Sequence, residues 1–129
     1  MKNKKYKILL AEDDQFLCKA LKDKLKRDNF SVNLVSNGNE VLPAVKKDKP
    51  DLILLDIMMP GKNGFEVIQE VRSEEDFKNL PIIIISNLGQ ENDIKKGIEL
   101  GAVGYIVKSD LSISEVAKKA REYLEDIKK

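Results

Sequence analysis

Five short apolar runs, each followed by a segment with helical spacing, are the feature of this chain that most limits its fold. The first run covers residues 8–11, and apolar residues recur at helical spacing after it. Strict alternation of strand and helix is typical of a parallel sheet whose strands are joined by crossover helices. The sequence therefore predicts an α/β protein, a three-layer (βα)5 sandwich with helices on both faces of a five-stranded parallel sheet.

The composition of the runs predicts where individual strands lie in the sheet. Residues 52–55 and 82–85 contain only Leu and Ile, as expected for strands that are buried on both faces. Asn33 interrupts the apolar run at residues 32–35, which is typical of a half-exposed strand. We expect residues 52–55 and 82–85 at the centre of the sheet and residues 32–35 at an edge.

Cap residues and helix breakers indicate where helices start and how stable they are. We expect Asn39 to cap the second helix, and Pro43 fits that helix only in or near its first turn, so a late start or a kink is predicted. Gly97 weakens the fourth helix by about 1 kcal/mol relative to Ala. Ser112, with Glu115 three residues later, predicts a capping box at the start of the last helix.

Residues that can handle a metal or a phosphate follow four of the apolar runs. Glu12 and Asp13 follow the first run, Asp56 the third, Ser86 the fourth and Lys108 the fifth. The carboxyl ends of parallel strands share one crevice, which is where open α/β sheets bind ligands. We therefore expect three acids, a hydroxyl and an ammonium to meet in space.

Crowded carboxylates repel one another unless a divalent cation neutralises them, and Mg²⁺ suits a site made only of oxygen ligands. Asp56, at the end of a buried strand, has the position of a carboxylate nucleophile that could accept a phosphoryl group. Lys108 could pair with the phosphoryl oxygens or with Asp56 itself, and Ser86 could donate a hydrogen bond to a phosphoryl oxygen. Taken alone, each residue is more often a helix cap, a turn residue or a surface charge, but their conjunction at four strand ends favours a functional site.

Length, charge and residue usage exclude several other classes. The chain has 129 residues, enough for one domain with a real core, and we expect no second domain and no output domain in residues 1–129. A net charge of +1 gives no field that would attract nucleic acid or an anionic membrane. Without histidine, zinc, haem and Ser-His-Asp chemistry are poor candidates. Cys18 stands alone, and no signal peptide pattern is present, so we expect a cytoplasmic protein.

The motifs resemble the receiver domain of two-component response regulators from end to end. The matching stretches are residues 8–14, residues 50–60 with Gly64, residues 81–86 and residues 101–108. The resemblance implies a flavodoxin-like fold with strand order 2-1-3-4-5. It also implies a signalling switch, which is no enzyme beyond catalysing its own phosphorylation and dephosphorylation.

By that resemblance, Asp56 is the phosphoacceptor, and Glu12 and Asp13 hold Mg²⁺ together with Asp56 and the backbone carbonyl of Met58. A sensor histidine kinase or a phosphotransfer protein donates the phosphoryl group.

Ser86 is implied to be the switch hydroxyl, Lys108 the lysine that pairs with the phosphate, and Tyr105 the aromatic switch residue. In the family, the fourth helix, fifth strand and fifth helix then change their surface for a partner. That partner is expected to be a separate protein.

The chain departs from the family pattern at two places. Asn87 stands where a small alanine is usual, and Ser109 replaces the proline that commonly follows the lysine. Without that proline we expect a trans peptide bond between Lys108 and Ser109, because a cis bond that does not precede proline costs about 2.5–4 kcal/mol. Val103 and Gly104 lack the acidic pair of regulators that dimerise through this face, so that dimer is not supported.

Three alternative functions share this fold or this chemistry. A phosphatase with an aspartate nucleophile commonly needs a second acid two residues on, which Met58 is not. A docking module that takes no phosphate is disfavoured because all five pocket residues are present. Flavin binding is disfavoured because acids follow the first strand where a flavin phosphate would need donors. Met58 and Leu88 are both apolar and flank the phosphoacceptor in the family pattern, which suggests slow loss of the phosphoryl group.

Overall fold

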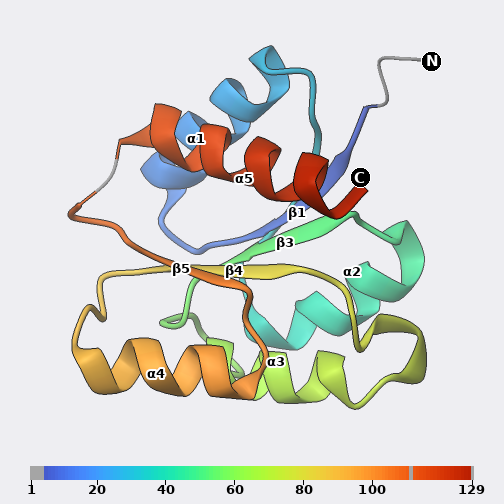
Figure 1. The fold of residues 1–129 in the computed structure, drawn as a ribbon, viewed down its shortest axis with the longest axis vertical. Coiled ribbons are helices and arrows are strands. Elements are labelled where there is room, and N and C mark those ends of the chain that lie inside the picture. The colour runs from blue at the N-terminus through green and yellow to red at the C-terminus, as the bar shows by residue number, and fades with distance from the viewer. Residues whose placement is uncertain (1–4, 111, 129) are drawn as a thin grey trace.

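Five parallel strands form one sheet in the order β2-β1-β3-β4-β5, as predicted (Figure 1). The computed structural model describes residues 5–110 and 112–128. The strands are β1 (Lys7–Ala11), β2 (Ser31–Val35), β3 (Leu52–Leu55), β4 (Ile82–Ser86) and β5 (Gly104–Val107). In this register Ala11 of β1 lies beside Leu55 of β3. The residues that follow these two strands therefore lie next to each other at the carboxyl end of the sheet.

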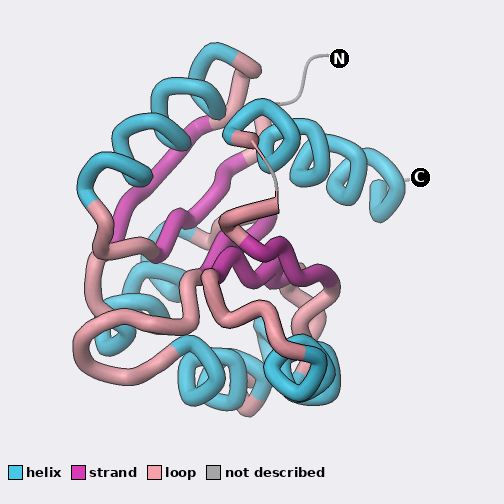
Figure 2. The backbone as a smooth tube through the Cα atoms, turned by 90° about the vertical axis from the view of Figure 1, so that its left-hand side faces the viewer, coloured by secondary structure: helices cyan, strands magenta, loops and turns pink. Residues whose placement is uncertain are grey.

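Helices cover both faces of the sheet and make the predicted three layers. Figures 1 and 2 show α1 and α5 on one face and α2, α3 and α4 on the other. The helices are α1 (Gln15–Arg27), α2 (Val41–Asp48), α3 (Gly64–Arg72), α4 (Glu91–Leu100) and α5 (Ile113–Lys128), with short 3-10 helices η1 (Gly38–Glu40) and η2 (Glu75–Phe77). No helix among the described residues is both long enough and apolar enough to cross a membrane.

Each face of the sheet packs its own apolar core. Leu52 and Leu54 of β3 point toward the α1 and α5 side, whereas Ile53 and Leu55 point toward α2 and α3. All residues of β3 and β4 are buried, while β2 is half exposed. The predicted central and edge strands are therefore confirmed, and each fully buried Leu or Ile side chain contributes about 1.5–3 kcal/mol.

The predicted cap at Asn39 is wrong, whereas the predicted capping box at the start of the last helix is confirmed. The side chain of Asn37, and not that of Asn39, caps η1, since it accepts a hydrogen bond from the Asn39 N–H at 2.8 Å. The 3-10 turn delays α2 until Val41, and Pro43 then lies in the first turn, where a missing N–H costs nothing. At α5, Ser112 and Glu115 make the predicted reciprocal capping box.

Gly97 lies inside α4 because that position has no room for a side chain. A Cβ there would come within 2.5 Å of Ile84 Cδ1 and 3.2 Å of the Tyr105 ring. The helix therefore accepts the lower helix propensity of glycine in exchange for close contact with β4 and β5. It ends at Gly101, whose φ of 121° favours glycine.

We expect Gly97→Val to lower the free energy of unfolding by about 1–3 kcal/mol, because the new side chain overpacks the contact with Ile84 and Tyr105. Urea denaturation followed by circular dichroism measures this difference. Lys95→Val introduces the same residue at an exposed position of the same helix and should cost only about 0.5 kcal/mol. A loss in Gly97→Val no larger than that in Lys95→Val would show that a side chain fits at this position and would contradict crowding as the reason for the glycine.

Candidate metal centre

Three carboxylates gather at the carboxyl ends of β1 and β3. Oxygens of Glu12, Asp13 and Asp56 all lie within 4.8 Å of one another. Glu12 is 1% exposed and Asp56 is 4% exposed, whereas Asp13 is open to solvent. Pairing of β1 with β3 produces this arrangement, and the Asp56 N–H donates to the Ala11 carbonyl at 2.9 Å.

Lys108 is the cation that approaches these carboxylates. Its Nζ lies 2.9 Å from Glu12 Oε1 and 3.2 Å from Asp56 Oδ2. The lysine follows β5, and its backbone N–H donates to the Ser86 carbonyl at 2.9 Å, which fixes it beside the end of β4. The sequence predicted contact of Lys108 with Asp56 but not its shorter contact with Glu12, because the spacing of strands along the chain does not give side-chain reach.

Burial and charge shift the ionisation of this pair. Burial of the Glu12 carboxyl, with a smaller contribution from the charge of Asp56, raises its pKa to about 7, although the hydrogen bond from Lys108 opposes the shift. Burial lowers the pKa of Lys108, but its hydrogen bond to Glu12 and the negative charges of Asp56 and Glu12 outweigh that effect and raise it. The ammonium therefore stays charged, while Glu12 exchanges its proton near neutral pH.

Backbone donors orient the two buried carboxylates. The Met58 N–H donates to Asp56 Oδ1 at 3.2 Å, and the Asp14 N–H donates to Glu12 Oε2 at 3.1 Å. Asp14 is the residue that caps α1, since its side chain accepts from the Leu17 N–H. Asp14 is therefore explained by its role as a helix cap. Glu12 and Asp13 do not cap α1, so that role does not explain them.

Ser86 and Tyr105 are both tied to Leu88, in the loop between β4 and α4. Ser86 is completely buried, and its Oγ accepts a hydrogen bond from the Leu88 N–H at 3.1 Å. The Tyr105 hydroxyl donates to the carbonyl of Leu88. Burial of the phenol, together with the charge of Asp93, raises the pKa of Tyr105. In the described part of the chain, no hydrogen bond joins Ser86 to Asp56.

Two further residues bear on the site. The peptide bond between Lys108 and Ser109 is trans, as predicted, since none of the described peptide bonds is cis. The Cys18 thiol donates to the backbone carbonyl of Glu12 at 3.0 Å, a contact that the sequence did not indicate. A lone cysteine on a helix carries no pattern that points to one particular carbonyl.

The donor set fits a hard divalent cation. Three carboxylates lie together, and among the described residues Lys108 is the one cation within 4.0 Å of any of them, contacting Glu12 and Asp56, so negative charge remains in excess once Glu12 ionises. The atoms with which these three side chains could bind a metal are all oxygens, which suit Mg²⁺ better than zinc. Glu12, Asp13 and Asp56 could hold such an ion, and Lys108 could balance the charge of a phosphoryl group beside it.

Comparison with known proteins agrees with this geometry. The family model of the response regulator receiver domain matches residues 8–121. The transcriptional regulatory protein BaeR of Escherichia coli O6:H1 is 39% identical over 102 residues, which make up 79% of this chain and 41% of BaeR. The chain spans less than half the length of the curated relatives it matches.

Solved structures share the same fold. The receiver domain of Francisella response regulator 1452 gives a TM-score of 0.87 at 25% identity, covering 95% of this chain and 98% of that one. The phosphorylated cyanobacterial phytochrome response regulator RcpA gives a TM-score of 0.81 at 28% identity, covering 95% and 93% of the two chains. With its strand order, its strand-end carboxylates and the match over residues 8–121, this chain belongs to the family of response regulator receiver domains.

Proposed function

We propose that Asp56 accepts a phosphoryl group from a sensor histidine kinase or a phosphotransfer protein, in the presence of Mg²⁺ held by Glu12, Asp13, Asp56 and the Met58 carbonyl. The observation that carries the proposal is the contact of Lys108 Nζ with both buried carboxylates, at 2.9 Å and 3.2 Å. A charged lysine held against two acids at the ligand-binding end of a parallel sheet suits a reaction that moves negative charge into the site. The phosphorylated state of RcpA is a precedent among structures of the same fold.

In the proposed reaction, a carboxylate oxygen of Asp56 attacks the phosphorus, the oxygen–phosphorus bond forms, and the phosphorus–nitrogen bond to the donor histidine breaks. The departing imidazole nitrogen leaves with the bonding electrons and is protonated. A bound Mg²⁺ supplies positive charge that offsets the charge of the incoming phosphoryl group. Lys108 then pairs with a phosphoryl oxygen in place of the carboxylate oxygen that it now contacts.

Ser86 and Tyr105 suit the proposed switch because both hold Leu88. The Ser86 Oγ accepts from the Leu88 N–H, and its own proton, which can bind the Tyr105 oxygen, could turn instead to a phosphoryl oxygen. Movement of Ser86 would disturb the backbone of Leu88, whose carbonyl accepts the hydrogen bond from the Tyr105 hydroxyl. Phosphorylation would thereby shift the population of conformers of the surface formed by α4, β5 and α5, which a separate partner protein reads.

We further propose that the protein works in the cytoplasm and acts through protein partners, without direct contact to nucleic acid or membrane. The alternative function is a docking module of receiver fold that takes no phosphate. The intact acidic cluster favours the phosphoacceptor, and the following measurement separates the two.

Incubation with Mg²⁺ and acetyl phosphate should add one phosphoryl group to the chain, because the small donor replaces the kinase. Intact-mass spectrometry measures the adduct, which should disappear in Asp56→Ala and when EDTA removes the metal. Asp76→Asn, a change at an exposed aspartate far from the cluster in sequence, should leave the adduct unchanged. A folded protein that binds Mg²⁺ but forms no adduct would favour the docking module.

Self-dephosphorylation should be slow, because Met58 and Leu88 offer no group that could orient a water molecule toward the phosphoryl group. The Met58 side chain is exposed and that of Leu88 is partly buried. We expect the phosphorylated lifetime to shorten several-fold in the double variant Met58→Asn, Leu88→Glu, as measured by the decay of the mass adduct after the donor is removed. A native lifetime shorter than that of the variant would contradict the prediction.

Affinity for Mg²⁺ should rise as the pH rises through about 7, the pKa of Glu12. Below that pH the buried carboxyl holds a proton, which the metal must displace; above it, the carboxylate is free to bind. Isothermal titration calorimetry across this range measures the dependence. Glu12→Gln should bind Mg²⁺ more weakly and lose this part of the pH dependence. An identical pH profile in the variant would show that another group is responsible.

A further inference from the structure

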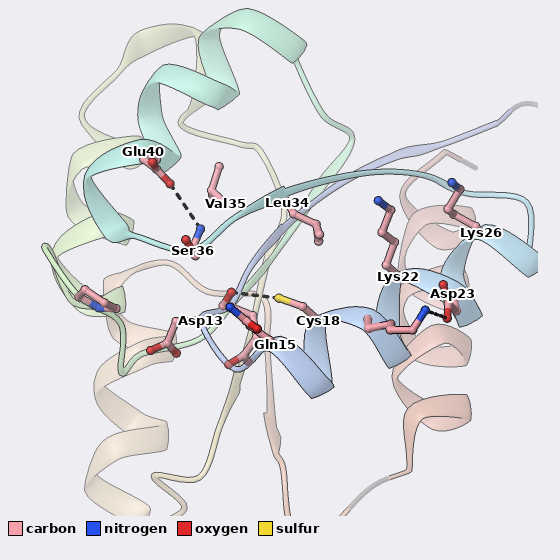
Figure 3. Close-up of a pocket in the computed structure, with 13 residues that line it drawn as sticks. Asp13, Gln15, Cys18, Lys22, Asp23, Lys26, Leu34, Val35, Ser36 and Glu40 are labelled. Atoms are coloured by element: carbon pink, nitrogen blue, oxygen red, sulfur yellow. Dashed lines mark hydrogen bonds and ion pairs between the residues drawn. The ribbon is translucent and has the colours of Figure 1, made fainter.

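A groove of about 850 Å³ runs between α1 and β2 and is separate from the α4, β5 and α5 surface. Figure 3 shows Leu34 of β2 pointing into it, Cys18 lying in its floor, and Lys22 and Lys26 reaching from α1 toward β2. Glu12 and Asp13 line its other end. The groove therefore begins at the acidic cluster and ends at a row of lysines.

The backbone of β2 is open at the outer edge of the sheet, and Leu34 and Val35 of this strand line the groove. β2 is an edge strand, and β1 is its partner in the sheet. The Ser31 N–H donates to the carbonyl of Tyr6, the residue before β1, and the Val35 carbonyl accepts from the N–H of Glu12, the residue after β1. Because alternate residues of a strand bond to one neighbour, the N–H and C=O groups of Val32 and Leu34 point to the open edge. Such an edge is a template for an added strand.

The two ends of the groove carry opposite charge. Lys22 and Lys26 have no carboxylate within 4.0 Å among the described residues, whereas the nearby Lys19 pairs with Asp23 at 3.3 Å. Leu34 between them is 39% exposed, a large apolar side chain on a charged surface. An occupant must therefore bring acidic groups to the lysine end and an apolar group to Leu34.

We propose that this groove binds an extended, acidic segment of a partner protein, which adds to the open edge of β2 as an outer strand. Backbone hydrogen bonds to Val32 and Leu34 would supply affinity, and carboxylates near Lys22 and Lys26 would supply specificity. A second copy of this chain fits less well, since its β2 is uncharged and its α1 would bring another row of lysines. This docking does not depend on phosphorylation of Asp56, so either proposal can fail alone.

The test titrates the ¹⁵N-labelled full chain, without phosphodonor, with the peptide acetyl-EVEVE-amide. We expect saturable shifts of the amide signals of Cys18, Lys22, Leu34 and Ser36, with a dissociation constant of about 1 mM or below. Cys18 is the single cysteine of the chain, so its rate of alkylation by iodoacetamide gives a second reading and should fall when the peptide binds. Absence of saturable shifts, or shifts centred on the β5 edge, would overturn the proposal.

Matched variants separate this groove from general attraction to a basic protein. Lys22→Glu combined with Lys26→Glu should weaken peptide binding about fivefold or more. Lys118→Glu combined with Lys119→Glu changes the net charge equally, at exposed positions of α5, and should leave binding unchanged. Equal weakening in both pairs would refute a specific groove.

Two modified peptides test the chemistry of the occupant. Acetyl-KVKVK-amide should not bind, because its charge is opposite. A version of the acidic peptide with every backbone nitrogen methylated should not bind, since it has no N–H group left to donate to β2. Equal binding by either peptide, or shifts of the same signals with protein concentration alone, would overturn docking of an acidic strand.

Discussion

Burial of Glu12 beside Asp56 is the constraint on which the site depends. Glu12 loses hydration at the carboxyl end of the sheet and meets the charge of Asp56, and both effects raise the pKa of Glu12. Lys108 offsets part of this cost by contacting both acids, but burial and the charge of Asp56 still raise the pKa of Glu12. Added positive charge would therefore stabilise these carboxylates. This makes the site suitable for a divalent cation and then for a phosphoryl group.

The sheet keeps these side chains together. Pairing of Ala11 with Leu55 brings the ends of β1 and β3 into register, and pairing of Ser86 with Val107 brings Lys108 beside the end of β4. A shift of one residue in either pair would turn the neighbouring side chains to the opposite face. The apolar residues of β3 and β4 oppose such a shift, because these strands are packed by helices on both faces.

Leu88 links the buried site to the surface on the other side of β4. Its N–H donates to Ser86 and its carbonyl accepts from Tyr105, so two residues of different strands hold one residue of the loop. Gly97 brings α4 close against the Tyr105 ring, so movement of the ring toward α4 would displace the helix. The groove between α1 and β2 lies apart from this linkage but shares Glu12 and Asp13 with the acidic cluster.

The sequence by itself determined the number and order of strands and helices, the central and edge positions of β2, β3 and β4, and the residue types that meet at the strand ends. These follow from apolar periodicity and from the placement of polar residues directly after apolar runs, which are local properties. Tertiary structure decided the contact of Lys108 with Glu12, the bond from Cys18 to the Glu12 carbonyl, the cap at Asn37 and the crowding at Gly97. Each of these depends on distances between segments far apart in the chain or on the exact start of a turn, and the spacing of residues along a sequence does not contain that information.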